Sequence, residues 1–72
     1  MRRYTPRVAK ALALYDRLIE ATGVMREALT EQVNTRVREF DPEEREAYYM
    51  GAVIIRRSRD LRLADAARAH RG

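Results

Sequence analysis

The segment Asp41-Pro42-Glu43-Glu44 constrains this chain more than any other part of its sequence. An acidic N-cap, proline at the first helical position and glutamate at the third form a capping box, which satisfies backbone N–H groups at the start of an α-helix. The three acids also lie at the positive end of the helix dipole. The segment therefore predicts a helix from residue 42. It assigns residues 48–55, which are aromatic and β-branched, to that helix rather than to a strand, because the chain has no second strand to pair with one.

A first helix is predicted over residues 6–21. Thr5 supplies an N-cap hydroxyl before Pro6, and Gly23 can adopt the left-handed conformation that ends a helix. Between these signals the apolar side chains recur at the spacing of one helix face. This face comprises Val8, Leu12, Tyr15, Ile19 and Thr22, with Ala11 and Leu18 beside it.

A second helix is predicted over residues 24–40, with a narrower apolar face. This face comprises Met25, Leu29, Val33, Val37 and Phe40, with Ala28 on its flank. Thr30, Asn34 and Thr35 are poor helix formers, so this helix needs tertiary packing to persist.

The third helix is predicted over residues 42–58. Its expected core face comprises Ala47, Gly51, Ile54, Ile55, Ser58 and Leu61, with Met50 at the edge. The small residues on this face would let another helix approach closely. Beyond Ser58 the pattern loosens, because Asp65 falls where the core face would continue. Either the third helix extends into solvent, or Ser58 caps a short fourth helix over residues 59–70.

The fold class that follows is all-α. A chain of 72 residues forms one domain at most, here a small three-helix bundle with a basic helical C-terminal tail. A core of this size supplies about 3–5 kcal/mol of stability. The sequence has no cysteine, which excludes a disulfide and a thiolate zinc site. Helix packing, oligomerisation or a partner must therefore supply the remaining stability.

Charge is segregated along the chain. Residues 1–10 carry a net charge of +4, residues 11–55 carry −4, and residues 56–72 carry +4. Arginines at both ends could neutralise the phosphates of a nucleic acid. The candidates for this contact are Arg2, Arg3, Arg7, Lys10, Arg56, Arg57, Arg59 and Arg62. Alternatively, these side chains pair with the acidic middle of the chain, within one subunit or between subunits.

The sequence contains no constellation for catalysis, metal binding or cofactor binding. The single histidine, His70, is two residues from the end of the sequence, and the single serine, Ser58, is expected to face the core. There is no glycine-rich phosphate loop and no metal-ligand spacing. We therefore expect a protein that is not an enzyme and that takes no cofactor, metal or small-molecule substrate.

The expected location is the cytoplasm. No apolar segment approaches the ~20 residues that span a bilayer. The basic start of the chain resembles a signal peptide, but residues 7–16 place charges where its apolar region should be. Fourteen of the fifteen basic residues are arginine, a composition typical of a bacterial or viral genome rich in G and C.

The third helix carries a second apolar surface. Tyr49 and Val53 are one turn apart and lie away from the expected core face, with Leu63 nearby in projection. Aromatic residues are enriched at the centres of protein interfaces, and Arg56 suits the rim of one. These four residues are the candidate protein interface. We expect self-association, a dimer being favoured, or a protein partner.

The function predicted from the sequence is that of a non-enzymatic interaction module. It would be an oligomeric accessory or regulatory protein of a bacterium or phage that binds a larger protein. The first alternative is a nucleic-acid-binding regulator that uses the arginine-rich ends. The second alternative is a structural subunit of a larger assembly, such as a viral one.

Overall fold

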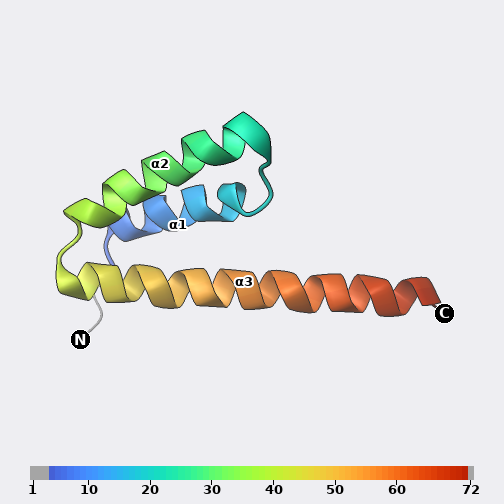
Figure 1. The fold of residues 1–72 in the computed structure, drawn as a ribbon. Coiled ribbons are helices and arrows are strands. Elements are labelled where there is room, and N and C mark those ends of the chain that lie inside the picture. The colour runs from blue at the N-terminus through green and yellow to red at the C-terminus, as the bar shows by residue number, and fades with distance from the viewer. Residues whose placement is uncertain (1–3, 72) are drawn as a thin grey trace.

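A computed structural model describes residues 4–71, which form three α-helices and no strand (Figure 1). Helix α1 spans Pro6–Leu18, α2 spans Gly23–Glu39 and α3 spans Pro42–Arg71. The predicted all-α fold is confirmed. The third helix is one continuous element of 30 residues, so no separate fourth helix begins at Ser58.

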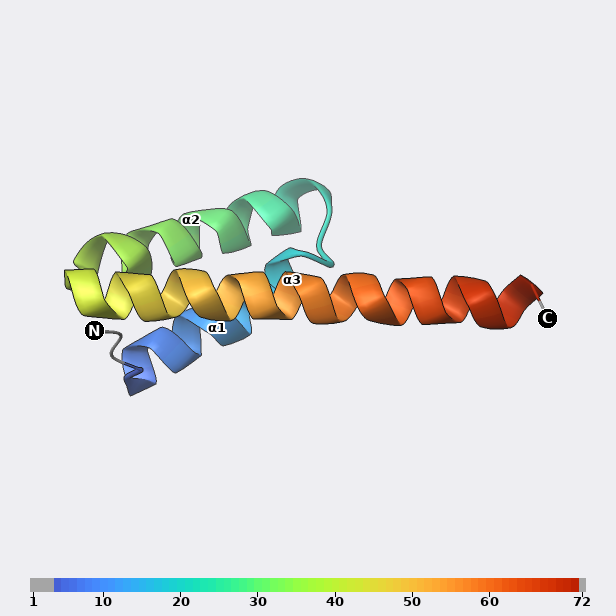
Figure 2. The same cartoon turned by 90° about the horizontal axis from the view of Figure 1, so that it is seen from below.

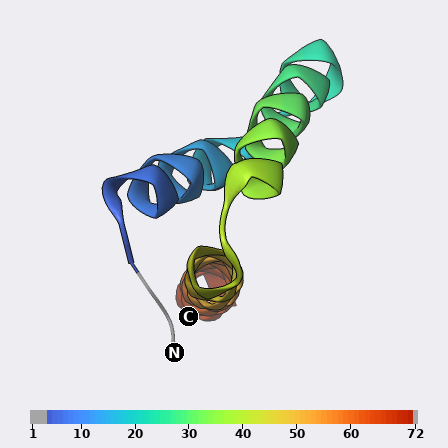
Figure 3. The same ribbon diagram turned by 90° about the vertical axis from the view of Figure 1, so that its left-hand side faces the viewer.

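Helix α1 is the centre of the packing, because it contacts both other helices extensively. Helices α1 and α2 lie along one side of the N-terminal half of α3, and the C-terminal half of α3 projects beyond them (Figures 1 and 2). Seen along the axis of α3, the other two helices diverge above it, and its far side has no neighbour in the part of the chain described (Figure 3). The radius of gyration, 14.3 Å, exceeds the value of about 11 Å expected for a compact chain of this length.

The helix starts follow their predicted capping chemistry. The Thr5 hydroxyl accepts a hydrogen bond from the backbone N–H of Val8 at 3.3 Å. At the start of α3, the N–H of Glu44 donates to Asp41 Oδ1 at 2.8 Å, and the N–H of Asp41 donates back to Glu44 Oε1 at 3.3 Å. This reciprocal pair is the capping box that the sequence predicts.

Helix α1 ends three residues earlier than predicted. The N–H groups of Glu20 and Ala21 bond to carbonyls three residues back instead of four, which tightens the chain out of the α-helix after Leu18. Gly23 has a positive φ of 61°, as its expected left-handed conformation requires. It stands at the start of α2 rather than directly at the end of α1.

The core is built where α1 meets the other two helices. Its buried members are Val8, Ala11, Leu12, Val33, Phe40, Ala47, Tyr48 and Ala52. Tyr48 lies among aromatic rings, with ring centroids 6.3 Å from Tyr15 and 6.2 Å from Phe40. In α2, Met25 was expected on the core face but is 57% exposed, because burial in this helix begins only at Leu29 and residues 23–28 are all exposed.

The core face of α3 differs from the predicted one. Ile54, Ser58 and Leu61 were expected inside and are exposed, whereas Tyr48 and Ala52 are buried. The expected close approach does occur at Gly51, where an added Cβ would lie 2.6 Å from Leu12 Cδ1.

The rotation of α3 that produces this face is fixed by long-range contacts at its N-terminus. The Glu44 side chain is only 2% exposed, and its Oε2 accepts a hydrogen bond from the Thr5 hydroxyl at 2.7 Å. Arg7 Nε lies 3.8 Å from the same oxygen. Glu44 must therefore point toward α1, and Tyr48, one turn later, follows it into the core.

Candidate interaction surface on helix α3

Four large apolar side chains of α3 are exposed side by side. Tyr49, Met50, Val53 and Ile54, here called the outer face, retain 39–59% of their accessible surface. They occupy two successive turns of the helix, so they form one continuous strip. Large exposed apolar patches on small proteins are typical of surfaces that bind another protein, a membrane or a ligand.

The outer face points directly away from the core. At 100° per residue, its four members cover an arc of about 140°. The residues of α3 that pack inward, Ala47, Tyr48, Gly51, Ala52 and Ile55, are centred on the opposite side of the helix. Residues 47–55 are thus apolar on both sides of the helix, a pattern typical of a helix that is buried between packing partners.

Opposite charges flank the outer face along the helix axis. Glu46 lies one turn before Tyr49 and Met50, and Arg57 lies one turn after Val53. Both are exposed, and both project within about 10° of the middle of the strip. Leu61, which is 61% exposed, continues the apolar surface beyond Arg57.

All four predicted interface residues are exposed, but they do not form a single patch. Tyr49 and Val53 belong to the outer face, whereas Leu63 lies in the projecting half of α3. Arg56 lies beside the outer face, because it lines a hollow of about 400 Å³ together with Val53, and it also borders a hollow of about 330 Å³ at the end of α1 together with Tyr15. Ala52, which projects near Tyr49 on a helical wheel, is buried against α1 and does not contribute.

Sequence reasoning missed half of the outer face. Met50 was expected at the edge of the core and Ile54 within it, and both are exposed. No local sequence signal could have found them, because the side of α3 that turns inward is set by the burial of Glu44 against Thr5, which lies 39 residues earlier in the sequence.

The predicted nucleic-acid candidates are divided by the structure. Arg7 donates a hydrogen bond to the carbonyl of Glu39 at 2.6 Å and its guanidinium lies 5.5 Å from the centre of the Phe40 ring. Arg59 donates to Glu20 Oε1 at 2.6 Å. These two arginines are engaged in holding helices together.

The remaining basic candidates do not gather into one surface. Arg56, Arg57 and Arg62 are exposed on α3, and Lys10 is exposed on α1. The start of α1 lies beside the N-terminal end of α3, far from the projecting half that carries Arg62 (Figure 1). Arg2 and Arg3 lie outside the described residues.

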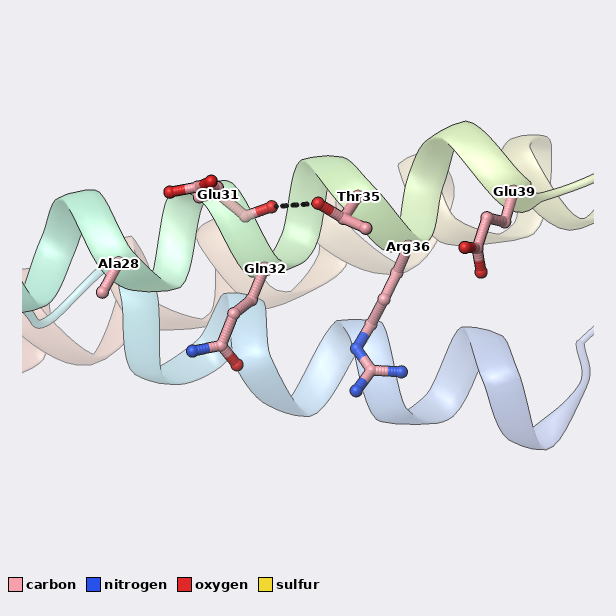
Figure 4. Close-up of a pocket in the computed structure, with 6 residues that line it drawn as sticks. All are labelled: Ala28, Glu31, Gln32, Thr35, Arg36 and Glu39. Carbon is pink, nitrogen blue, oxygen red and sulfur yellow. Dashed lines mark hydrogen bonds between the residues drawn. The ribbon is translucent and has the colours of Figure 1, made fainter.

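The hollows in the surface are shallow. One of about 550 Å³ runs along α2 and is lined by Ala28, Glu31, Gln32, Thr35, Arg36 and Glu39 (Figure 4). Thr35 donates its hydroxyl hydrogen bond to the Glu31 carbonyl at 2.9 Å, and the Gln32 and Arg36 side chains extend toward α1. Every lining residue comes from one helix, so the hollow brings together no groups from different elements.

Two further properties hold for residues 4–71. No group of three or more histidine, cysteine, aspartate or glutamate side chains is arranged to hold a metal ion. No helix combines the length and the apolar character needed to cross a bilayer.

Tyr48 connects the core to the outer face. Its ring centroid lies 5.5 Å from that of Tyr49 in an edge-on arrangement. Burial, with a smaller contribution from the neighbouring hydroxyls of Tyr15 and Tyr49, raises the pKa of Tyr48 to about 12. The Tyr48 phenol is therefore neutral at physiological pH, and its ring serves to support Tyr49 from within.

No protein-family model matches the sequence, and comparisons with curated proteins and with solved structures give no significant match.

Proposed function

We propose that this protein is a non-enzymatic helical interaction module that binds another protein through the outer face of α3. It would act as an accessory or regulatory protein in the cytoplasm of a bacterium or of a phage-infected cell. The observation that carries this proposal is the exposure of Tyr49, Met50, Val53 and Ile54 on the side of α3 that no other helix of residues 4–71 covers.

Burial of this face would have a large effect on so small a protein. Covering a side chain such as Val53 or Tyr49 contributes roughly 1.5–3 kcal/mol. The whole core of a domain of this size supplies about 3–5 kcal/mol. A protein that covers the outer face would therefore contribute as much stability as the core itself.

Affinity purification of the tagged chain from its own cell, with and without nuclease, tests the proposal. Val53→Glu places a charge in the middle of the outer face and should abolish recovery of the bound protein. Val24→Glu is the matched control, because Val24 is 82% exposed at the start of α2, away from the outer face. Recovery that withstands nuclease and is lost only with Val53→Glu supports the proposal. Equal recovery with all three proteins would exclude the outer face as the binding surface.

Nucleic-acid binding is the second candidate function, favoured by the exposed arginines of the second half of α3. These are Arg56, Arg57, Arg62 and Arg68. If they contact phosphates, affinity for mixed-sequence DNA or RNA should fall steeply with salt, and each contact removed should flatten the salt slope by about one unit. Gel shifts at two salt concentrations measure this. The absence of binding at low micromolar protein in low salt would eliminate this candidate.

A further inference from the structure

The molecule exposes more surface than a monomer of its mass ordinarily does. Its accessible surface is 5658 Å², and its mass is 8.4 kDa. A compact monomer of that mass exposes about 4,600 Å². The excess of about 1,000 Å² is similar to the ~800 Å² that each partner buries in a stable protein–protein interface. This excess includes the surface of the projecting half of α3 as well as the outer face.

The outer face and its flanking charges are arranged symmetrically along the helix. Tyr49 and Ile54 lie equally far from the point midway between residues 51 and 52, and so do Met50 and Val53. Glu46 and Arg57 are also equally far from that point, but they carry opposite charges. A two-fold axis through this point therefore brings the apolar residues of the two copies together along the seam. It also places Glu46 of each copy opposite Arg57 of the other copy.

We infer that the occupant of the outer face is a second copy of this chain, with the two α3 helices antiparallel about that two-fold axis. This inference rests on the proposed function, because it requires the outer face to be a binding surface. Closed two-fold pairing is the commonest way in which a protein binds itself.

The antiparallel arrangement defines the contacts. On one edge of the seam, Tyr49 packs against Val53 of the second copy, and on the other edge Met50 packs against Ile54 of the second copy. At each end of the apolar contacts, Glu46 of one copy lies beside Arg57 of the other copy. A parallel arrangement would instead place Glu46 beside Glu46 and Arg57 beside Arg57, which like-charge repulsion opposes.

Neither α1 nor α2 obstructs this pairing. Both helices lie on the opposite side of α3 from the outer face (Figure 3). The dimer would have the two α3 helices as its inner layer and an α1–α2 pair on each outside. The projecting halves of α3 would extend from opposite ends of the dimer, which leaves their arginines accessible to a further partner.

Charge exchange followed by sedimentation equilibrium tests both the occupant and the register. Glu46→Arg creates two arginine pairs across the seam, and Arg57→Glu creates two glutamate pairs, so each variant should raise the dimer dissociation constant about tenfold. The double variant Glu46→Arg/Arg57→Glu restores opposite charges and should recover the affinity of the unmodified chain. Val53→Glu should yield a monomer, whereas Val24→Glu should dimerise normally. Circular dichroism establishes that each variant is folded.

The outcomes separate this inference from the proposed function. An unmodified chain that is monomeric at high micromolar concentration would overturn the inference, and the purification with Val53→Glu would then decide whether a different protein occupies the outer face. A dimer whose affinity neither single charge variant changes would overturn the antiparallel register. A dimer weakened by both single variants and restored by the double variant is the expected result.

Discussion

The two sides of the first half of α3 are both apolar, but they are built from different side chains. The inward side combines the small Ala47, Gly51 and Ala52 with the larger Tyr48 and Ile55, and Leu12 lies so close to Gly51 that no Cβ fits without movement. The outer face presents Tyr49 and Val53, together with Met50 and Ile54, and no other helix of residues 4–71 covers it. Small residues allow a helix of the same chain to approach, whereas large exposed ones are typical of an interface with another molecule.

This difference shows that apolar character alone does not identify the core of a short helical chain. A helix with two apolar sides satisfies a periodicity test in either orientation. The side that turns inward is decided by contacts with residues far away in the sequence, here Thr5 and Leu12. Substitutions in three pairs of neighbouring residues, each with one inward and one outward member, test this difference between the two sides of α3.

The largest effect is expected from enlarging Gly51. Gly51→Leu forces a side chain against Leu12 in the buried seam, and such overpacking costs roughly 1–3 kcal/mol of unfolding free energy. Helix propensity acts in the opposite direction by up to ~1 kcal/mol. Val53→Leu, a substitution to the same residue on the outer face, should change the unfolding free energy by less than about 0.5 kcal/mol. Urea denaturation of both variants measures this. A Gly51→Leu variant as stable as the unmodified chain would show that α1 and α3 are not closely packed.

The next pair is Glu44 and Glu43, adjacent acids in the first turn of α3. Glu44→Ala removes the acceptor for the Thr5 hydroxyl and for the N–H of Asp41, and should cost about 2 kcal/mol. Glu43→Ala removes a neighbouring exposed charge and should cost about 0.3–1 kcal/mol through the helix dipole alone. Thermal melts compare the two. Equal losses would mean that the burial of Glu44 does not fix the orientation of α3.

The smallest effect is expected at high pH, from Tyr48. Because burial raises its pKa from 10.0 to about 12, the folded state disfavours the phenolate, so Tyr48 stabilises the fold fully below pH 10 and loses that contribution between about pH 10 and 12. Tyr48→Phe should flatten this loss by on the order of 1 kcal/mol. Tyr49→Phe removes the same hydroxyl from the outer face and should leave most of the pH dependence intact. Denaturation at pH 9.5 and pH 11.5, values chosen to lie about half a unit outside and inside that window, measures the difference. A Tyr48→Phe variant with the pH dependence of the unmodified chain would contradict the burial of this phenol.

Local signals in the sequence were sufficient to predict the helices. The Thr5 and Asp41 caps depend on hydrogen bonds within three residues, and the structure forms both of them. The left-handed conformation of Gly23 is equally local. The end of α1 was placed three residues late, because its tightened last turn has no distinct sequence pattern.

The orientation of α3 could be predicted only in part. Tyr49 and Val53 were expected outside and are exposed, but Ile54 was assigned to the core. The error arose because the periodic pattern weighed all large apolar residues alike, whereas the buried Glu44 and the small Ala52 determine the side that meets α1. The engagement of Arg59 by Glu20, 39 residues away, was likewise invisible in local sequence.

Antiparallel pairing of two copies through the outer faces of α3 fixes one long distance between equivalent residues of the two copies. The chain has no cysteine, so Ala66→Cys provides a single site for a spin label in the exposed projecting half of α3. Residue 66 then lies on opposite ends of the antiparallel dimer, and the rise of 1.5 Å per residue places the two labels about 45 Å apart. Pulsed dipolar spectroscopy should report that distance, and the signal should disappear when Val53→Glu is added. A distance below about 25 Å would indicate parallel helices. The absence of any coupling between labels in the unmodified background would mean that the outer face does not bind a second copy.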